Sequence, residues 1–303
     1  MSYPPDEPLS ELVRGLKSPS PLVRAKAARA LGKLGPTGND VFAQLVTLSN
    51  DREQAVREAA VQGLTAFGLH ALPTFIRLLG HSCKYVRRNA VWGLGKLGPD
   101  ARPALASLLG VLKDPDPRTA TGAAQALGAI GHTAADAVPA LAEAMRGTNV
   151  VLCRMASKAL SQIGPPALPT LVNHLKHHDP FVRGEAAVAL GWMGPAAAPA
   201  VPHLLGLLST SASGRMAKPT QEWFDRGSGT ATPVATPPVS AADEAMVLQV
   251  VQALGRIGPG AIDAEGHLVE LMDDPRDNVR SAVVMAVRCI RGEVEADPEA
   301  DDA

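Results

Sequence analysis

Metal binding is the first chemistry that the sequence suggests. His174, His177, His178 and Asp179 lie within six residues, and His174 and His178 have the i,i+4 spacing that metal-binding helices use. The group falls where a helix is expected to end in a turn, with no cysteine or further carboxylate nearby. We therefore predict a solvated edge here. No HExxH, GxSxG or phosphate-loop pattern occurs, so we predict no catalytic residue, no cofactor and no metal.

Recognition of another protein is the second chemistry. Two of the three tryptophans, Trp92 and Trp192, share a helical phase with lysine, arginine and amide side chains. Exposed tryptophan beside such residues is typical of a protein-binding surface, although the two rings could instead fill gaps between alanine-rich helices. The predicted partner-binding residues are Lys26, Arg29, Lys33, Gln62, Asn89, Trp92, Lys96, Gln125, Lys158, Gln162, Trp192, Gln252 and Arg256.

The helices that carry these side chains belong to a repeated unit, which is clearest in residues 179–195, DPFVRGEAAVALGWMGP. Successive units are offset by 33, 30, 33, 33, 30, 64 and 33 residues, where the step of 64 contains an insertion. Each unit predicts a first helix (A) and a second helix (B) with one buried stripe. A period of this length predicts an all-α solenoid of about eight helical hairpins. The units are aligned on Val23, Val56, Val86, Thr119, Leu152, Val182, Met246 and Val279.

Glycine, proline and aspartate recur at fixed places in the unit. A glycine inside helix B predicts close approach of the neighbouring helix, because it otherwise costs about 1 kcal/mol relative to alanine. A Gly-Pro pair predicts that helix B ends in a left-handed glycine cap. An Asp-Pro pair predicts a capping carboxylate at the start of helix B. The Asp-Pro pairs begin at Asp114, Asp179 and Asp274, and the helical glycines are Gly32, Gly95, Gly128, Gly191 and Gly255.

The repeated VRxxAAxALGxxG pattern resembles the HEAT repeat, in particular the short bacterial type called PBS-lyase HEAT-like, over residues 9–292 apart from the insertion. The resemblance implies that B helices line the concave face and that turn aspartates pair with a structural arginine ladder. Repeats four, five and seven carry Ala120, Cys153 and Val247 at the ladder position, so a broken ladder is expected there. The ladder arginines are Arg24, Arg57, Arg87, Arg183 and Arg280.

Composition divides the chain into a solenoid with three less regular parts. Residues 1–8 form a proline-rich leader, residues 209–242 a flexible insertion in repeat seven, and residues 293–303 an acidic tail. Within the insertion, Trp223 and Phe224 either rest on the solenoid edge or form a motif that docks in the chain's own groove or on a partner.

Charge and cysteine content limit the choice of function. Residues 1–100 hold 13 Lys/Arg and 8 Asp/Glu, a net charge of +5, but the whole chain carries −1. This balance argues against a nucleic-acid partner. The three cysteines form no CxxC pair and the N-terminus has no signal-peptide pattern, so we predict a cytoplasmic protein without a membrane span.

The sequence therefore predicts a non-catalytic scaffold that holds a partner segment along its concave face. Two alternatives remain. The name-giving relatives handle bilin chromophores, which implies an accessory protein of the phycobilin-lyase kind, and the basic N-terminal half could bind nucleic acid. A further type of relative, the HEAT-like hydroxylases, holds two irons with His-Glu pairs. No histidine in this chain is directly followed by a glutamate, so we reject a hydroxylase function.

Overall fold

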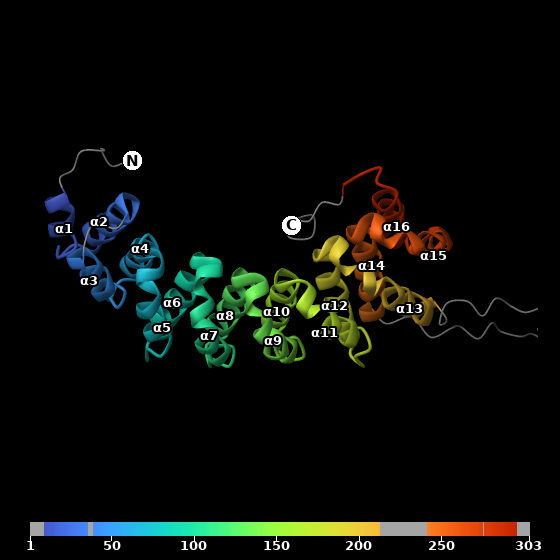
Figure 1. Cartoon of the computed structure of the whole chain (residues 1–303), viewed down its shortest axis with the longest axis horizontal. Coiled ribbons are helices and arrows are strands. Elements are labelled where there is room, and N and C mark those ends of the chain that lie inside the picture. Colours follow the sequence, from blue (N-terminus) through green and yellow to red (C-terminus); the bar gives the residue numbers. More distant parts are fainter. Residues whose placement is uncertain (1–8, 36–38, 213–240, 275, 296–303) are drawn as a thin grey trace, which may run out of the picture. The chain divides into compact units, whose positions relative to one another are not determined.

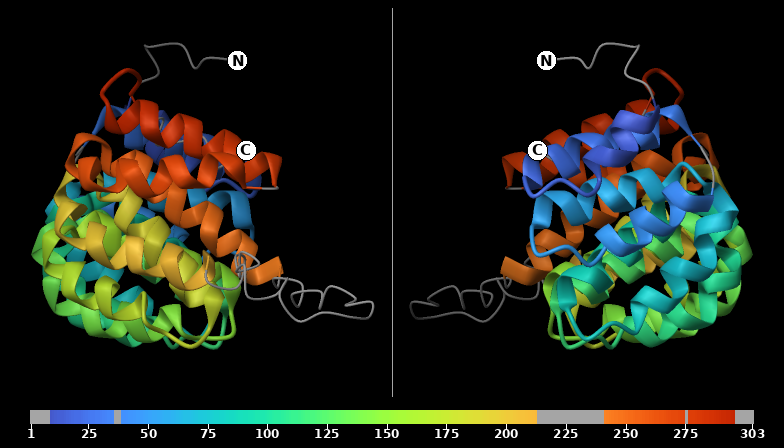
Figure 2. Two further views of the ribbon diagram at one scale, coloured as in Figure 1. Left: turned by 90° about the vertical axis from the view of Figure 1, so that its right-hand side faces the viewer. Right: turned by 90° about the vertical axis from the view of Figure 1, so that its left-hand side faces the viewer.

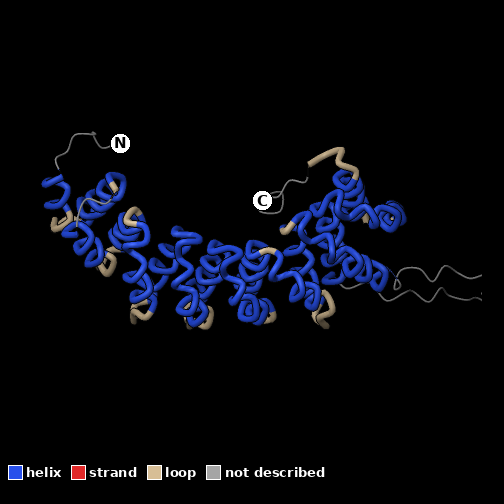
Figure 3. Tube along the Cα trace, in the orientation of Figure 1, coloured by secondary structure: helices blue, strands red, loops and turns tan. Residues whose placement is uncertain are grey.

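The computed structural model describes residues 9–35, 39–212, 241–274 and 276–295, and within these ranges it contains helices and loops but no strand (Figure 3). The chain divides into two compact units, Met1–Ile163 and Gly164–Ala303. The predicted leader and the aromatic pair Trp223 and Phe224 lie outside the described residues, as does the end of the predicted tail from residue 296.

The N-terminal unit holds five helix pairs (Figure 1). Each B helix packs against the next B helix along the chain, and each A helix packs on the B helix that follows it. The A helices are α1 (Leu9–Gly15), α3 (Asn39–Leu48), α5 (Leu72–Leu79), α7 (Leu105–Val111) and α9 (Val138–Met145). The B helices are α2 (Pro21–Leu34), α4 (Gln54–Thr65), α6 (Lys84–Leu97), α8 (Pro117–Ile130) and α10 (Val150–Ile163).

The C-terminal unit holds three more pairs, so the described residues show the eight hairpins that the repeat predicts. The helix α14 (Ala241–Ile257) packs between α12 (Pro180–Trp192) and α16 (Asp277–Ile290), and the left view of Figure 2 shows α14 and α16 side by side. Because α13 (Val201–Ala212) continues through Ala212 and α14 begins at Ala241, both ends of the predicted insertion are helical. The pairs are α11 (Leu168–His174) with α12 (Pro180–Trp192), α13 (Val201–Ala212) with α14 (Ala241–Ile257), and α15 (Glu265–Glu270) with α16 (Asp277–Ile290).

Short 3-10 helices connect most B helices to the following A helix. The junction glycines have a positive φ, as the Gly-Pro pattern predicts, but at Gly35, Gly98 and Gly164 the ψ is not that of a left-handed helix: Gly35 has φ 81° and ψ −161°, and Gly164 has φ 80° and ψ −141°. This region is essentially restricted to glycine. The predicted left-handed helical cap is therefore wrong at these three glycines, because the chain leaves the helix in an extended mirror-image conformation. The connecting elements are η1 (Gly68–Ala71), η2 (Gly98–Ala104), η3 (Gly131–Ala137), η4 (Pro165–Ala167), η5 (Gly194–Ala200) and η7 (Gly258–Ala264).

The start of helix B departs from the prediction at two of three positions. Asp179 is the N-cap of α12 and accepts a hydrogen bond from a backbone N–H two residues on, at 2.9 Å. Asp114 and Asp274 lie two residues before the N-caps of α8 and α16. They accept instead from the backbone N–H groups of Asp116 and Arg276, at 2.8 and 3.0 Å. The prediction that these two carboxylates cap a helix is wrong, because each closes the turn that precedes it.

Close packing of B helices explains the recurrent helical glycine. A Cβ atom built on Gly255 would lie 2.9 Å from the Cα atom of Ala286, and one on Gly32 would lie 2.8 Å from the Cα atom of Gly63. Gly128 and Gly191 are equally tight. Gly95 differs, because its Cβ atom would lie 3.7 Å from Ala126, an ordinary van der Waals distance. The predicted close approach is found at four of the five glycines, and α6 and α8 are farther apart at the fifth.

One described segment, Glu244–Asp273, has the length and mean hydropathy of a membrane-crossing helix. More than half of its most apolar window is buried in the fold, and Gly258, with φ 67°, divides the segment into α14 and shorter elements. Burial and interruption are the properties of a core segment.

Candidate partner-binding face

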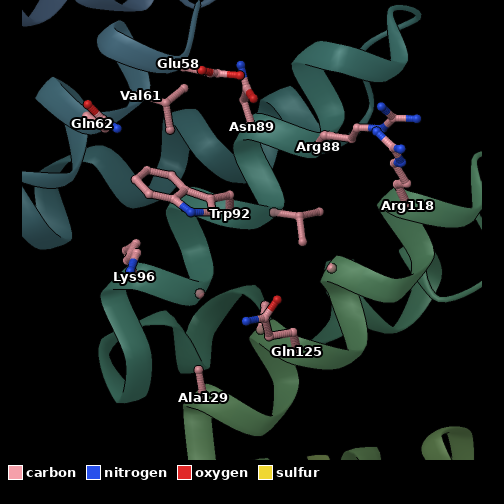
Figure 4. A pocket seen from close by; sticks show the side chains of 14 residues that line it. Glu58, Val61, Gln62, Arg88, Asn89, Trp92, Lys96, Arg118, Gln125 and Ala129 are labelled. Carbon is pink, nitrogen blue, oxygen red and sulfur yellow. The ribbon is translucent and has the colours of Figure 1, made fainter. Parts of the chain in front are cut away.

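A pocket of about 500 Å³ lies on the B helices of the N-terminal unit, between α4, α6 and α8 (Figure 4). This volume falls within the range of ~300–1,000 Å³ that is typical of ligand-binding pockets. Five residues of the predicted partner-binding set line it: Gln62, Asn89, Trp92, Lys96 and Gln125. The helical repeat positions them together, because they occupy the third, sixth or tenth place after the aligned valine or its equivalent.

Trp92 is the largest apolar side chain on this face, and 42% of its surface is exposed. In Figure 4 its ring lies between Val61 and Lys96. The Lys96 ammonium stands 5.5 Å from the ring centroid, in cation–π geometry. The Trp92 ring is therefore partly exposed and lies beside the positive charge of Lys96. A partly exposed tryptophan next to a basic side chain is typical of residues that anchor a binding partner.

Three amide side chains border the pocket without hydrogen bonds inside the described part of the chain: Gln62, Asn89 and Gln125. Each offers both donors and an acceptor. A peptide backbone needs the same combination of partners, so these amides can bind a main chain.

Basic side chains, of which Lys84 and Arg118 are exposed and Arg88 is half-buried, continue the face at the N-terminal ends of α6 and α8. Tyr85 lies among three cations, with Arg57, Lys84 and Arg88 between 5.2 and 5.5 Å from its ring centroid. Arg88 makes a two-fold hydrogen bond with the carboxylate of Asp116, in which Nε donates at 2.6 Å. This bond, with additional donation from Thr119, holds the pKa of Asp116 well below its usual range despite burial.

The ladder arginines of the N-terminal unit tie successive turns together. Arg24 donates through Nε and Nη2 to Asp51, at 2.9 Å each, and Arg87 donates in the same way to Asp114, at 2.6 and 2.8 Å. Nη1 of each arginine donates to two carbonyl oxygens of its own turn. The bond from Arg87 is the main reason why the pKa of Asp114 is lowered. At Asp51 burial is the largest influence and raises the pKa, but the hydrogen bonds from Arg24 and from the backbone N–H of Glu53, together with the charges of Arg24 and Arg57, lower it overall.

Comparison with known proteins agrees with this repeated geometry. The family model described as HEAT repeats matches residues 2–65, 42–110, 72–157 and 138–218, which together span more than half of the 303 residues. The chain belongs to the HEAT-repeat family. A search of curated proteins finds no match to this HEAT-repeat chain.

Solved structures that resemble the HEAT-repeat chain are distant. A designed armadillo-repeat protein for modular peptide recognition is 20% identical, with 61% of this chain and 99% of that chain covered and a TM-score of 0.42. The CpcE–CpcF complex of phycocyanin lyase from Nostoc is 21% identical, with coverages of 95% and 97% and a TM-score of 0.43. Human deoxyhypusine hydroxylase is 19% identical, with coverages of 94% and 96% and a TM-score of 0.36. All three are too distant to indicate a function.

In this HEAT array, the ladder arginine Arg57 has no aspartate partner in the turn of the next repeat. Arg57 is 7% exposed, and its Nη1 donates to the carbonyl oxygens of Asp51 and Arg52 at 2.7 and 2.8 Å, but its buried Nε has no acceptor. The place of the turn aspartate is taken by His81, five residues before Val86. His81 keeps the turn, because its Nδ1 accepts from the backbone N–H of Cys83 at 3.0 Å, but it does not accept from the arginine.

We predict that His81→Asp stabilises the N-terminal unit by about 1–2 kcal/mol, because a carboxylate can close the turn and also accept from Arg57. The measurement is the urea midpoint of unfolding by circular dichroism. His132→Asp, at an exposed site in η3, is the matched control. If the free energy of unfolding rises no more in His81→Asp than in the control, a missing acceptor for Arg57 does not limit stability.

The ladder also varies in the C-terminal HEAT repeats. Arg183 donates through Nη1 to the carbonyl oxygens of His177 and His178, at 2.9 and 2.8 Å, and its Nε lies 3.1 Å from the sulfur of Met246. Arg280 donates to the carbonyl oxygen of Asp274 and forms an ion pair with Asp277. The carboxylate of Asp274 accepts from Arg276, at 2.8 and 2.9 Å, because repeat seven offers Val247 at the ladder position.

The remaining predicted face residues do not join the Trp92 pocket. Lys26, Arg29 and Lys33 are exposed on α2, whereas Lys158 and Gln162 lie on α10. In the C-terminal unit, Trp192, Gln252 and Arg256 are half-buried on α12 and α14. The structure thus gathers only the residues of repeats two to four around one pocket.

The prediction of a solvated edge at the histidine cluster is wrong for His174, which is buried and whose Nδ1 lies 2.8 Å from the carbonyl oxygen of Thr170. His178 is exposed, and its ring lies 4.2 Å from that of His177. No group of three or more His, Cys, Asp or Glu side chains suited to a metal occurs among the described residues.

Sequence reasoning missed two features of this face, the Arg88–Asp116 pair and Arg118 at the rim of the pocket. A signal for the pair was present, since Asp116 stands directly before Pro117, the first residue of α8.

Proposed function

We propose that this HEAT-repeat chain is a non-catalytic scaffold that holds a segment of another protein along the B-helix face of its N-terminal unit. The observation that carries the proposal is the pocket at Trp92, where an exposed ring, three amides without a hydrogen bond to any described residue, and basic side chains converge. Aromatic and arginine side chains dominate binding energy at protein interfaces, and amides can satisfy the backbone of a bound segment.

The charge of this half of the chain supports a partner segment with acidic character. The first 100 residues carry a net charge of +5, and Glu58 is the one acidic side chain among the described residues that line the pocket. Of the three basic side chains in the lining, Arg88 is paired with Asp116, whereas Lys96 and Arg118 are in no ion pair with a described residue. Complementary charge speeds association and fixes the register of a partner.

We expect Trp92→Ala to weaken partner binding at least tenfold, about 1.4 kcal/mol, because the substitution removes the central aromatic anchor. Partners are first isolated with the intact protein, and their affinities are then measured by biolayer interferometry. Leu69→Ala is the matched control, because Leu69 is 57% exposed on η1 and lies outside the pocket.

The same experiment separates the proposal from its alternatives. Equal affinity of the Trp92→Ala and wild-type proteins for every partner rules out this face. Recovery of a bilin, detected by its visible absorbance, favours a chromophore-handling protein. Recovery of nucleic acid with an affinity that falls steeply with salt favours the basic N-terminal half as its site.

A further inference from the structure

The pocket at Trp92 exists because its floor has almost no side chains. Gly95, Gly122, Ala126 and Ala129 line it, and the wider spacing of α6 and α8 at Gly95 leaves the recess open. At the tight junctions of the same array, such as Gly128 against Ala159, the backbone of the next helix fills this place. The recess is therefore a local feature of repeats three and four.

The walls of the recess suit a flat apolar group. Val61 and Val91 also line the recess, and both valines are almost fully buried. Aromatic rings pair favourably in offset or edge-to-face geometry and bury ~150–250 Å² each. A volume of about 500 Å³ holds one such side chain together with part of its backbone.

The rim of the recess offers one arginine that is not engaged elsewhere in the described part of the chain. Arg88 is tied to Asp116, and the Lys96 ammonium stands over the Trp92 ring. Arg118, the second residue of α8, is exposed and has no hydrogen bond or ion pair among the described residues. A guanidinium binds carboxylates with two parallel hydrogen bonds, which a lysine cannot do.

We propose that the recess takes an aromatic side chain of the partner segment, and that an aspartate or glutamate next to it in sequence pairs with Arg118. This inference rests on the function proposed above and names the partner class as an acidic-aromatic linear segment. Gln62, Asn89 and Gln125 bind the backbone on either side of the aromatic residue.

A phage-displayed library of random dodecapeptides, selected on the full chain, tests the inference without a known partner. We expect the enriched peptides to share an aromatic residue with an acidic residue close to it. Their affinity for Arg118→Glu is expected to fall at least tenfold. Gly95→Ala and Ala129→Leu, which add side-chain atoms to the floor, are expected to weaken binding by a similar factor.

Matched controls separate binding from folding. Lys113→Glu reverses a charge outside the pocket, and Gly110→Ala adds a methyl group to α7 where nothing lies within 4 Å. Both are expected to bind as the wild type does. Gly95→Ala is expected to keep or raise the melting temperature while it loses affinity, which a merely destabilised variant would not show.

Two outcomes overturn the inference. In the first, the enriched peptides lose affinity for Trp92→Ala but bind Arg118→Glu, Gly95→Ala and Ala129→Leu as they bind the wild type. This result is compatible with the scaffold function but contradicts an acidic-aromatic partner segment. If no enriched peptide depends on Trp92, both this inference and the proposed function fail.

Discussion

Asp116→Ala is expected to lower the free energy of unfolding of the N-terminal unit by about 3 kcal/mol. The carboxylate accepts from Arg88 Nε at 2.6 Å and from the backbone N–H and hydroxyl of Thr119, at 2.9 and 2.7 Å. Alanine removes the N-cap of α8, typically worth ~1 kcal/mol. It also leaves the guanidinium of Arg88 without its partner in a half-buried position, and breaking a buried pair costs ~3–5 kcal/mol when exposure is minimal.

The measurement for this prediction is urea unfolding, combined with hydrogen exchange of the α8 amides because repeat arrays can unfold in parts. Asp136→Ala is the matched control. Asp136 pairs with Arg102, but the two side chains are 71% and 46% exposed, respectively, and exposed ion pairs contribute at most ~1 kcal/mol. Asp116→Asn separates the two roles, because asparagine still caps a helix but cannot form the ion pair. Equal losses for Asp116→Ala and Asp136→Ala would contradict the predicted role.

Acid is expected to weaken the same contacts. The pKa values of Asp51, Asp114 and Asp116 all lie below the ordinary 3.8 in the folded chain. Groups with a depressed folded-state pKa give their full stabilisation above the unfolded pKa and lose it as the pH falls through the folded pKa. Stability should therefore be level above pH ~5, decline progressively below it and fall less steeply in Asp116→Asn.

The repeat made the fold predictable to the level of individual helices. Eight hairpins follow from the spacing of a valine, two small residues and a leucine, because this pattern leaves helix B one buried stripe. The ends of the helices were less predictable. Asp114 and Asp116 are both followed by proline, and only the backbone path decides that the second is the N-cap of α8. Likewise, the sign of φ at Gly35 followed from the sequence, but its ψ did not.

The candidate site was predictable in its residue types and not in its shape. The phase of Gln62, Asn89, Trp92, Lys96 and Gln125 placed them on one face. The pocket depends on the distance between α6 and α8. Glycine occupies the same repeat position at Gly95, where the next helix is farther away, and at Gly128, where it is in close contact. Interhelical distance is set by the packing of side chains from several helices, which no single repeat encodes.

The missing acceptor for Arg57 could have been read from the sequence. Arg24 and Arg87 are each followed, at the corresponding turn of the next repeat, by Asp51 and Asp114, while Arg57 is followed by His81. What the alignment could not show is that the histidine still closes its own turn, so that the mismatch leaves the buried Nε of Arg57 without an acceptor.

Gly255→Val is expected to destabilise the C-terminal unit by about 3 kcal/mol, because the new side chain meets backbone and not a movable side chain. A Cβ atom at this position would lie 2.9 Å from the Cα atom and 3.1 Å from the Cβ atom of Ala286 on α16. Relief requires α14 and α16 to separate, and overpacking of this kind costs ~1–3 kcal/mol or more. A β-branched side chain is also stiff inside a helix.

Gly95→Ala, at the corresponding position of another repeat, is expected not to destabilise the protein. The comparison therefore tests whether close approach of the neighbouring helix is what makes glycine necessary at Gly255. Its Cβ atom is 3.7 Å from Ala126, and a glycine-to-alanine change inside a helix gains up to ~1 kcal/mol when nothing clashes. The comparison by urea unfolding should therefore show a loss at Gly255 and no loss at Gly95. A loss at both would mean that the glycines are needed for something other than helix approach, whereas no loss at either would mean that the two helices separate at little cost. Only a loss at Gly255 without a loss at Gly95 supports the conclusion that local interhelical distance, and not the repeat pattern itself, makes the tight junctions and leaves the Trp92 pocket open.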